Sequence, residues 1–276
     1  MKLGCHLSIS KGYVNTVETA QQMGCQSFQF FTKNPRAFKG KAADPDQAAK
    51  GRELLARYGL VAVAHAPYIT NLSTPDPELQ QISIASLKQD LENAEAYGAI
   101  GCVCHMGKHV DQGVEYGMSR MVETLDMLLD AYKGSCLLLL ENTAGQGSEL
   151  GTTLEQCMDV RSRVAQPHRI GFCFDTCHGY AAGAYRPEEW SQFIAHARSL
   201  GYWDHLKAVH LNDSKAEYGK RKDRHEVLGK GFIGESGLAA ILSSGAFADL
   251  PVVLETPVEN EQEYIPEMAA ARRLSQ

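Results

Sequence analysis

The sequence predicts an α/β protein with a single domain over residues 1–276, folded as a closed (β/α)8 TIM barrel. Two observations favour this fold: short apolar runs alternate eight times with helical patterns, and six of the runs lead directly into a histidine or a carboxylate. An open doubly wound sheet is the alternative, but the glycines form no dinucleotide fingerprint at the first strand. Barrels of roughly 250 residues fold as one unit, and no linker rich in Pro, Gly or Ser divides this chain.

Eight buried parallel strands are expected where the chain has short hydrophobic runs of β-rich composition. In chain order they are predicted at Lys2–Leu7, Ser27–Thr32, Leu60–Ala64, Ile100–Cys104, Cys136–Leu140, Ile170–Phe174, Leu206–Val209 and Pro251–Leu254. A helical pattern follows each of these runs, as a barrel of this type requires.

Two of the helical patterns are especially regular. One spans Pro77–Tyr97 and the other spans Met118–Tyr132. Their apolar positions, spaced as on one face of a helix, are Leu79, Ile82, Leu87 and Leu91 in the first and Met121, Leu125, Leu128 and Leu129 in the second. Asp76 is placed to cap the start of the first helix, and Gly98 and Gly134 follow the two helix ends.

Polar residues stand where six of the predicted strands end. They are His65, His105, Glu141, Asp175 with His178 three residues later, His210 and Glu255; a further cluster, Asp223-Arg224-His225, follows the His210 run. Because the carboxyl ends of barrel strands converge at one mouth, where barrel enzymes place their chemistry, these side chains are expected to form one site.

The residue types in this set predict a metal centre with more than one ion. Five histidines and four carboxylates offer only nitrogen and oxygen ligands, which suit zinc, manganese or iron better than magnesium or calcium. A single histidine at a strand end is usually a packing residue, but the same chemistry at six strand ends is improbable as coincidence. At three or four ligands per ion, with a bridging carboxylate, the nine residues serve two or three metals. His6 and His109 are candidates for orienting a ligand or a phosphate.

Composition predicts a soluble, cytoplasmic protein. Hydrophobic residues make up 44% of the chain, which is ample for a core, and neither a signal peptide nor a run of membrane-spanning length is expected. The eight cysteines are scattered, several inside apolar runs, so we expect reduced and buried thiols. Cys177 differs because it lies between Asp175 and His178. No Cys-x-x-Cys pair supports zinc bound by thiolates.

Several long motifs resemble those of one known family. They are H-L-N-D-S-K-A-E-Y-G-K-R-K-D-R-H-E-V-L-G-K-G from His210 to Gly231, G-F-C-F-D-T-C-H from Gly171 to His178, E-N-T-A-G-Q-G from Glu141 to Gly147, T-K-N-P-R ending at Arg36 and H-A-P-Y ending at Tyr68. This ordered set resembles the endonuclease IV family of apurinic/apyrimidinic endonucleases over nearly the full length. The resemblance implies a (β/α)8 barrel with zinc ions that cleaves DNA on the 5′ side of an abasic site.

The resemblance also implies roles for individual residues. It assigns a first zinc to His65, His105 and Glu141, a second to Glu141, Asp175, His210 and Glu255, and a third to His178, Asp223 and His225. It further implies three Zn²⁺ per chain, with Mn²⁺ acceptable at one or more positions, and Glu141 and Glu255 as catalytic carboxylates. One departure is Met106, where many relatives have proline after the histidine.

The implied substrate is double-stranded DNA with abasic sites or blocked 3′ ends. The protein is expected to be a monomer and to have no membrane partner. A net charge of −6 looks unsuited to DNA, but three divalent ions add six positive charges at the mouth. Two loops are locally basic: 33–41 has no acidic residue, and 215–230 has six basic residues. By resemblance, Arg36 and Tyr68 enter the duplex at the lesion, where a missing base makes distortion less costly.

Two other functions compete with this interpretation. A metal-dependent sugar isomerase or epimerase shares the barrel and the ligand types, but it leaves the cluster Asp223-Arg224-His225 without a role. A non-catalytic, metal-stabilised DNA-binding module is disfavoured, because structural zinc sites are usually closed, four-ligand and often rich in cysteine. Nicking of an abasic duplex distinguishes the endonuclease from both, and turnover of a ketose or aldose would identify the isomerase.

Overall fold

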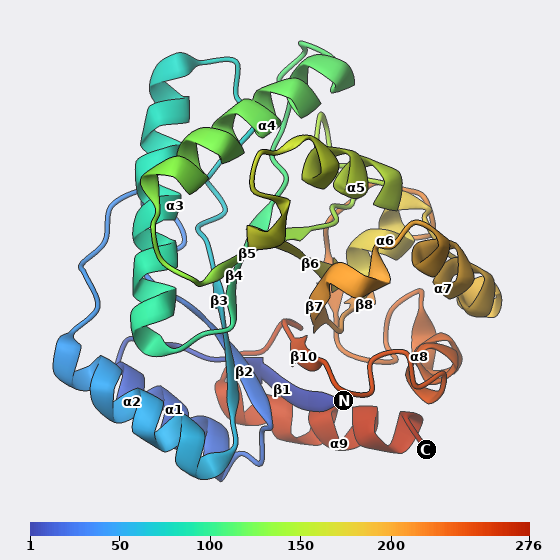
Figure 1. Ribbon diagram of the computed structural model, residues 1–276. Coiled ribbons are helices and arrows are strands. Elements are labelled where there is room, and N and C mark those ends of the chain that lie inside the picture. Colours follow the sequence, from blue (N-terminus) through green and yellow to red (C-terminus); the bar gives the residue numbers. More distant parts are fainter.

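The computed structural model describes residues 1–276, in which eight parallel strands close into a barrel surrounded by helices (Figure 1). The strands are β1 (Lys2–His6), β2 (Ser27–Phe31), β3 (Val61–His65), β4 (Gly101–His105), β5 (Leu137–Glu141), β6 (Ile170–Asp175), β7 (Leu206–His210) and β10 (Pro251–Leu254). Each pairs with its neighbours in the order β1-β10-β7-β6-β5-β4-β3-β2. The predicted fold is confirmed, and both ends of every predicted strand lie within one residue of the ends of an observed strand.

Helices form the outer layer of the barrel (Figure 1). They are α1 (Tyr13–Gln22), α2 (Pro45–Tyr58), α3 (Pro77–Tyr97), α4 (Val114–Ala131), α5 (Leu154–Arg163), α6 (Thr176–Ala182), α7 (Trp190–Ser199), α8 (Gly234–Ser243) and α9 (Tyr264–Leu274). A short antiparallel pair, β8 (Asp213–Ser214) and β9 (His225–Glu226), follows β7 outside the barrel sheet. No helix combines the length and the apolar character needed to cross a membrane. All eight cysteines are buried and free.

The helix α3 has the predicted ends and part of the predicted apolar face, because Leu87 and Leu91 are fully buried. Asp76 accepts hydrogen bonds from the main chain of the first turn, and Gly98 ends the helix with a φ of 78°. Ile82, predicted to be buried, is 39% exposed, whereas the charged Asp90 is fully buried. In addition to these leucines, the helix buries a strip of polar side chains that bond to a neighbouring loop, and the apolar pattern alone did not indicate that strip.

The end of α4 also differs from the prediction. The helix begins four residues before Met118 and ends at Ala131, and Tyr132 then adopts an extended conformation. Gly134 therefore is not the helix cap. Tyr132 ends the helix because its buried ring turns inward and its hydroxyl donates a 2.9 Å hydrogen bond to Glu95 Oε2.

The barrel interior explains how the strand ends form a site. One side chain from each of five consecutive strands fills the interior: Val63, Val103, Leu139, Cys173 and Ala208. Residues two positions apart in a strand share a face. The next inward positions are therefore His65, His105, Glu141, Asp175 and His210, which form a polar layer above the apolar plug.

Candidate metal centre

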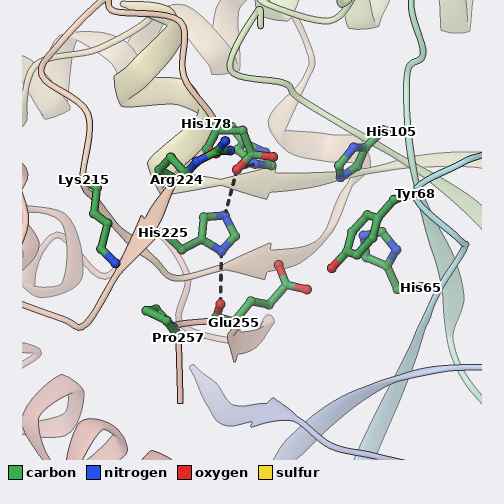
Figure 2. A pocket seen from close by; sticks show the side chains of 10 residues that line it. His65, Tyr68, His105, His178, Lys215, Arg224, His225, Glu255 and Pro257 are labelled. Atoms are coloured by element: carbon green, nitrogen blue, oxygen red, sulfur yellow. Dashed lines mark hydrogen bonds and ion pairs between the residues drawn. The ribbon is translucent and has the colours of Figure 1, made fainter. Parts of the chain in front are cut away.

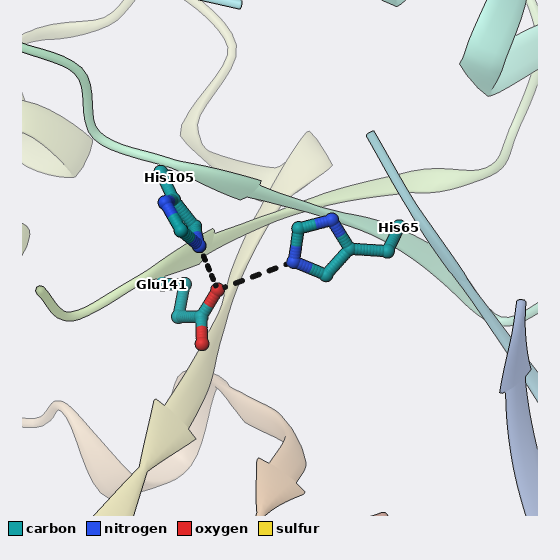
Figure 3. Close-up of side chains that lie close together, drawn as sticks. All are labelled: His65, His105 and Glu141. Carbon is teal, nitrogen blue, oxygen red and sulfur yellow. Dashed lines mark ion pairs between the residues drawn. The ribbon is translucent and has the colours of Figure 1, made fainter. Parts of the chain in front are cut away.

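The first group of ligand atoms comes from β3, β4 and β5. His65 Nε2 and His105 Nε2 lie 3.4 and 3.1 Å from Oε2 of Glu141 (Figure 3). Glu141 is fully buried at the end of β5, and both histidines are also at the last position of their strands. The three side chains thus converge because their strands are adjacent in the barrel.

A second group lies on the opposite oxygen of the same glutamate. His210 Nδ1 is 2.7 Å from Glu141 Oε1 and 3.0 Å from Glu255 Oε2. It is also 3.9 Å from Asp175 Oδ2. The ligand atoms of these four residues all lie within 4.8 Å of one another. Glu141 therefore belongs to both groups, one through each carboxylate oxygen.

The third group surrounds Asp223. Its Oδ1 lies 3.2 Å from His178 Nε2 and 3.6 Å from His225 Nε2. Local structure places these residues: Asp175 Oδ1 caps α6 by accepting the main-chain N–H of His178, and His225 lies in β9. His225 Nε2 is also 3.5 Å from Asp175 Oδ2, so the third group adjoins the second.

Four of the five histidines are oriented for metal binding. In each, one ring nitrogen faces a carbonyl oxygen, which can only accept a hydrogen bond, so the other nitrogen is the one directed at a ligand group. The acceptors are the main-chain oxygens of Ala66 for His65 (2.6 Å), Asn142 for His178 (3.0 Å) and Glu255 for His225 (3.1 Å), and Gln29 Oε1 for His210 (2.8 Å).

Three buried atoms in this cluster lack any hydrogen-bond partner, namely Glu141 Oε2, His178 Nε2 and His225 Nε2. Unpaired buried polar atoms are costly, and here all three are ligand atoms of the first or the third group. The nitrogen and oxygen donors fit zinc or a similar divalent ion. The nine predicted residues therefore fit divalent cations by both position and chemistry.

Charge interactions within the cluster are strong. Burial opposes ionisation of Glu141, but His210 and His105 outweigh it and hold the pKa of this carboxyl well below its usual range. Burial likewise opposes ionisation of Asp223, whereas the charge of His178 lowers the pKa of this carboxyl. Both carboxylates are consequently ionised at neutral pH and attract cations.

Four other residues singled out in the sequence have clear positions. His6 Nδ1 lies 3.1 Å from Gln29 Nε2, next to the second group, whereas His109 accepts the main-chain N–H of Gly113 away from it. Met106 is buried, and its Sδ lies 3.4 Å from Cys157 Sγ, so it packs toward α5 and leaves His105 at the site. Burial raises the pKa of Cys177 to about 12, which keeps this thiol neutral.

Gln29 is a residue of this site that the sequence interpretation missed. It is fully buried in β2, and its Nε2 donates a 2.6 Å hydrogen bond to Glu255 Oε1. Its Oε1 accepts from His210 Nε2, so one amide orients two residues of the second group. The signal was present in S-F-Q-F-F, where a single polar residue interrupts an apolar run.

Replacing Gln29 by alanine is expected to weaken metal retention by about 10- to 100-fold, as removal of such orienting contacts commonly does. Glu255 would lose its donor, and His210 would lose the acceptor that fixes its ring. The measurement is metal content after dialysis against graded concentrations of chelator, compared with wild type. Gln26→Ala, at an exposed position before the same strand, is the matched control. Equal metal retention in Gln29→Ala and wild type would exclude this role.

Asp213 is a second residue that the sequence interpretation missed. This fully buried carboxylate accepts main-chain hydrogen bonds from Gly229, Gly231 and Ile233, at 2.9–3.0 Å. A Cβ on Gly231 would lie 2.5 Å from Asp213 Oδ1, so only glycine permits the close approach. Asp213 therefore fixes the segment that follows His225.

Tyr68, one of the two residues predicted to contact DNA, lines an open hollow of about 360 Å³ together with several metal-ligand candidates, whereas Arg36 does not line it. Figure 2 shows Tyr68 beside His65 and His105 on one side, and Lys215 and Arg224 on the other. Tyr68 is 56% exposed, and its ring packs edge-on against His65. The basic loop 215–230 thus does contribute cationic side chains to the site.

The loop 33–41 is only partly as predicted. Arg36 is exposed, but Lys33 is buried and its Nζ lies 2.9 Å from Asp90 Oδ2. The expectation that Lys33 adds to a DNA-facing basic patch is therefore wrong. Its charge is neutralised inside the protein by an aspartate that is distant in the sequence.

Residues 17–274 match a family described as the xylose isomerase-like TIM barrel. A protein of Symbiobacterium thermophilum called probable endonuclease 4 is 74% identical over 276 residues, which is 100% of both chains. The crystal structure of endonuclease IV from Thermus thermophilus superimposes with a TM-score of 0.87 at 33% identity, covering 99% of this chain and 98% of the other.

More distant structures share the architecture. A D-tagatose 3-epimerase-like protein superimposes with a TM-score of 0.73 at 18% identity, covering 100% of this chain and 98% of the other. At this identity the likeness concerns the barrel alone.

Proposed function

This chain belongs to the endonuclease IV family, and we propose that it is a metal-dependent DNA repair endonuclease acting at abasic sites. It hydrolyses the phosphodiester on the 5′ side of the abasic nucleotide, leaving a 3′-hydroxyl beside a 5′-deoxyribose phosphate. It also removes blocking groups from 3′ ends, and it acts as a monomer.

The observation that carries this proposal is the convergence of nine side chains in the three ligand groups that contain no cysteine. The groups are His65, His105 and Glu141; Glu141, Asp175, His210 and Glu255; and His178, Asp223 and His225. We assign one divalent ion, Zn²⁺ by preference, to each group, with Mn²⁺ acceptable at one or more of them. Oriented imidazoles and unpaired buried atoms support this assignment.

When bound in these groups, divalent ions would neutralise phosphate charge and lower the pKa of the attacking water. The protein's own residues do the rest. Glu141 and Glu255 hold negative charge at fixed positions on either side of His210 Nδ1, where it attracts cations. Lys215 and Arg224, which line the same hollow, contact phosphate oxygens electrostatically. Tyr68 and Arg36 contact the duplex at the lesion.

A sugar epimerase remains the second candidate because that chemistry occurs on similar barrels. One specific feature opposes it. The group formed by His178, Asp223 and His225 lies beside the second group, and a one- or two-metal epimerase has no use for it.

The deciding experiment measures nicking of a duplex with one abasic site and the metal content of the same preparation. We expect cleavage on the 5′ side and close to three divalent ions per chain, chiefly zinc. Intact duplex and a panel of ketoses are the comparison substrates. One metal or fewer in active protein would contradict the three-ion assignment, and ketose turnover without nicking would favour the epimerase.

A further inference from the structure

The loop Lys33–Ala43, here called the Arg36 loop, connects β2 to α2 and lies against α3. Its central part carries Arg36, which is exposed. The following inference rests on the proposed role of Arg36 in DNA binding. It concerns how the backbone of a loop that has no helix or strand of its own is held in place around Arg36.

The beginning of the Arg36 loop is anchored on α3 by a buried ion pair. Lys33 Nζ lies 2.9 Å from Asp90 Oδ2 and donates a 2.8 Å hydrogen bond to the main-chain oxygen of Ser86. The hydroxyl of Thr32 donates to the other oxygen of Asp90. The side chains of Lys33 and Asp90 are 2% and 0% exposed, so solvent does not compete with this anchor.

The end of the Arg36 loop is anchored on the same helix by two amides. Gln89 accepts from Gly40 N at 2.9 Å and donates to Gly40 O at 3.0 Å. Asn93 accepts from Ala43 N at 2.8 Å and donates to Lys41 O at 3.0 Å. Each amide thus satisfies one main-chain donor and one main-chain acceptor, as a neighbouring strand would.

The two anchored ends of the loop also pack against each other. A Cβ on Gly40 would lie 2.6 Å from Cβ of Lys33, so the end of the loop packs directly on the stem of the buried lysine. The four α3 residues involved, Ser86, Gln89, Asp90 and Asn93, have the i, i+3, i+4, i+7 spacing of one helix face. This polar strip of α3 is buried in addition to the apolar residues Leu87 and Leu91.

We propose that Gln89 and Asn93 are positioning residues for damaged-DNA recognition, holding the Arg36 loop in its binding conformation before DNA arrives. Between the anchors the loop has local bonds only, from Arg36 N to Asn34 Oδ1 and from Ala37 N to Asn34 O. Without the anchors, the loop would lose conformational entropy when DNA binds, and this cost would lower the affinity for DNA. With them, the ordering is already achieved on folding.

The test uses full-length protein in which Gln89 or Asn93 is replaced by alanine. Gln89 is half-buried, so its replacement leaves the core intact, and Asn93→Ala serves as the second variant. We expect the Kd and KM for abasic duplex to rise on the order of tenfold, with kcat and metal content close to wild type. Gln81→Ala, an exposed glutamine on the same helix, is the matched control and should match wild type.

Two further variants separate positioning from general stability. Gln89→Met keeps side-chain volume but loses both hydrogen bonds, and it should behave as Gln89→Ala does. In a double-mutant cycle, Gln89→Ala should add little to Arg36→Ala, because both act through the same contact.

Three results would overturn the proposal: wild-type affinity in Gln89→Ala and Asn93→Ala, full restoration by Gln89→Met, or additive effects with Arg36→Ala. If wild-type protein neither binds nor cuts abasic duplex, the proposed function itself is wrong. That outcome is distinct from one in which wild type and the Gln89 and Asn93 variants are equally active.

Discussion

Glu141→Gln is expected to lower the rate of abasic-site cleavage by more than about 100-fold while the barrel stays folded. Glu141 is the one residue shared by the first and second ligand groups, with one carboxylate oxygen toward each. An amide of the same size offers only one oxygen, so it cannot hold both groups in the same way. The measurement is the single-turnover rate on abasic duplex, with circular dichroism to verify the fold.

The matched control for this substitution is Glu18→Gln, which makes the same chemical change at an exposed position on α1. Its rate should equal that of wild type. Metal content should fall in Glu141→Gln and remain unchanged in Glu18→Gln. Near-normal cleavage by Glu141→Gln would mean that the active metals are held elsewhere.

Asp213→Ala is expected to lower the free energy of unfolding by about 3–5 kcal/mol and to impair metal retention as well. The carboxylate is buried and accepts hydrogen bonds from several main-chain N–H groups of the segment 229–234. Hydrogen bonds to a charged acceptor contribute roughly 1.5–3 kcal/mol each, and alanine removes all of them. The segment anchored in this way follows His225, so the third ligand group should lose order too.

Chemical denaturation and metal analysis of the same samples test this expectation. Asp213→Asn retains one acceptor oxygen and should lose less stability than the alanine variant. If the free energy of unfolding of Asp213→Ala lies within about 1 kcal/mol of the wild-type value, the segment 229–234 does not depend on this carboxylate for its structure.

The sequence alone determined the barrel and most of the side chains at its mouth. Apolar runs alternating with helical patterns leave few folds open, and the eight predicted strands agree with the observed ones. A residue at the end of a parallel strand is placed by the fold itself, which is why His65, His105 and Glu141 were brought together as expected. Such inferences need only local periodicity and the common direction of the strands.

Tertiary structure alone decided the partners of buried polar groups. Gln29 had no recognisable role until its contacts with Glu255 and His210 were seen, and on α3 the structure buries Asp90 but leaves Ile82 partly exposed. Lys33 belongs to a basic run in the sequence, yet it forms a buried ion pair with Asp90. The physical reason is that a buried polar group must find a partner, and that partner is chosen by packing between segments far apart in the chain. Periodicity reports which side of an element is buried by apolar residues, but it carries no information about such pairings.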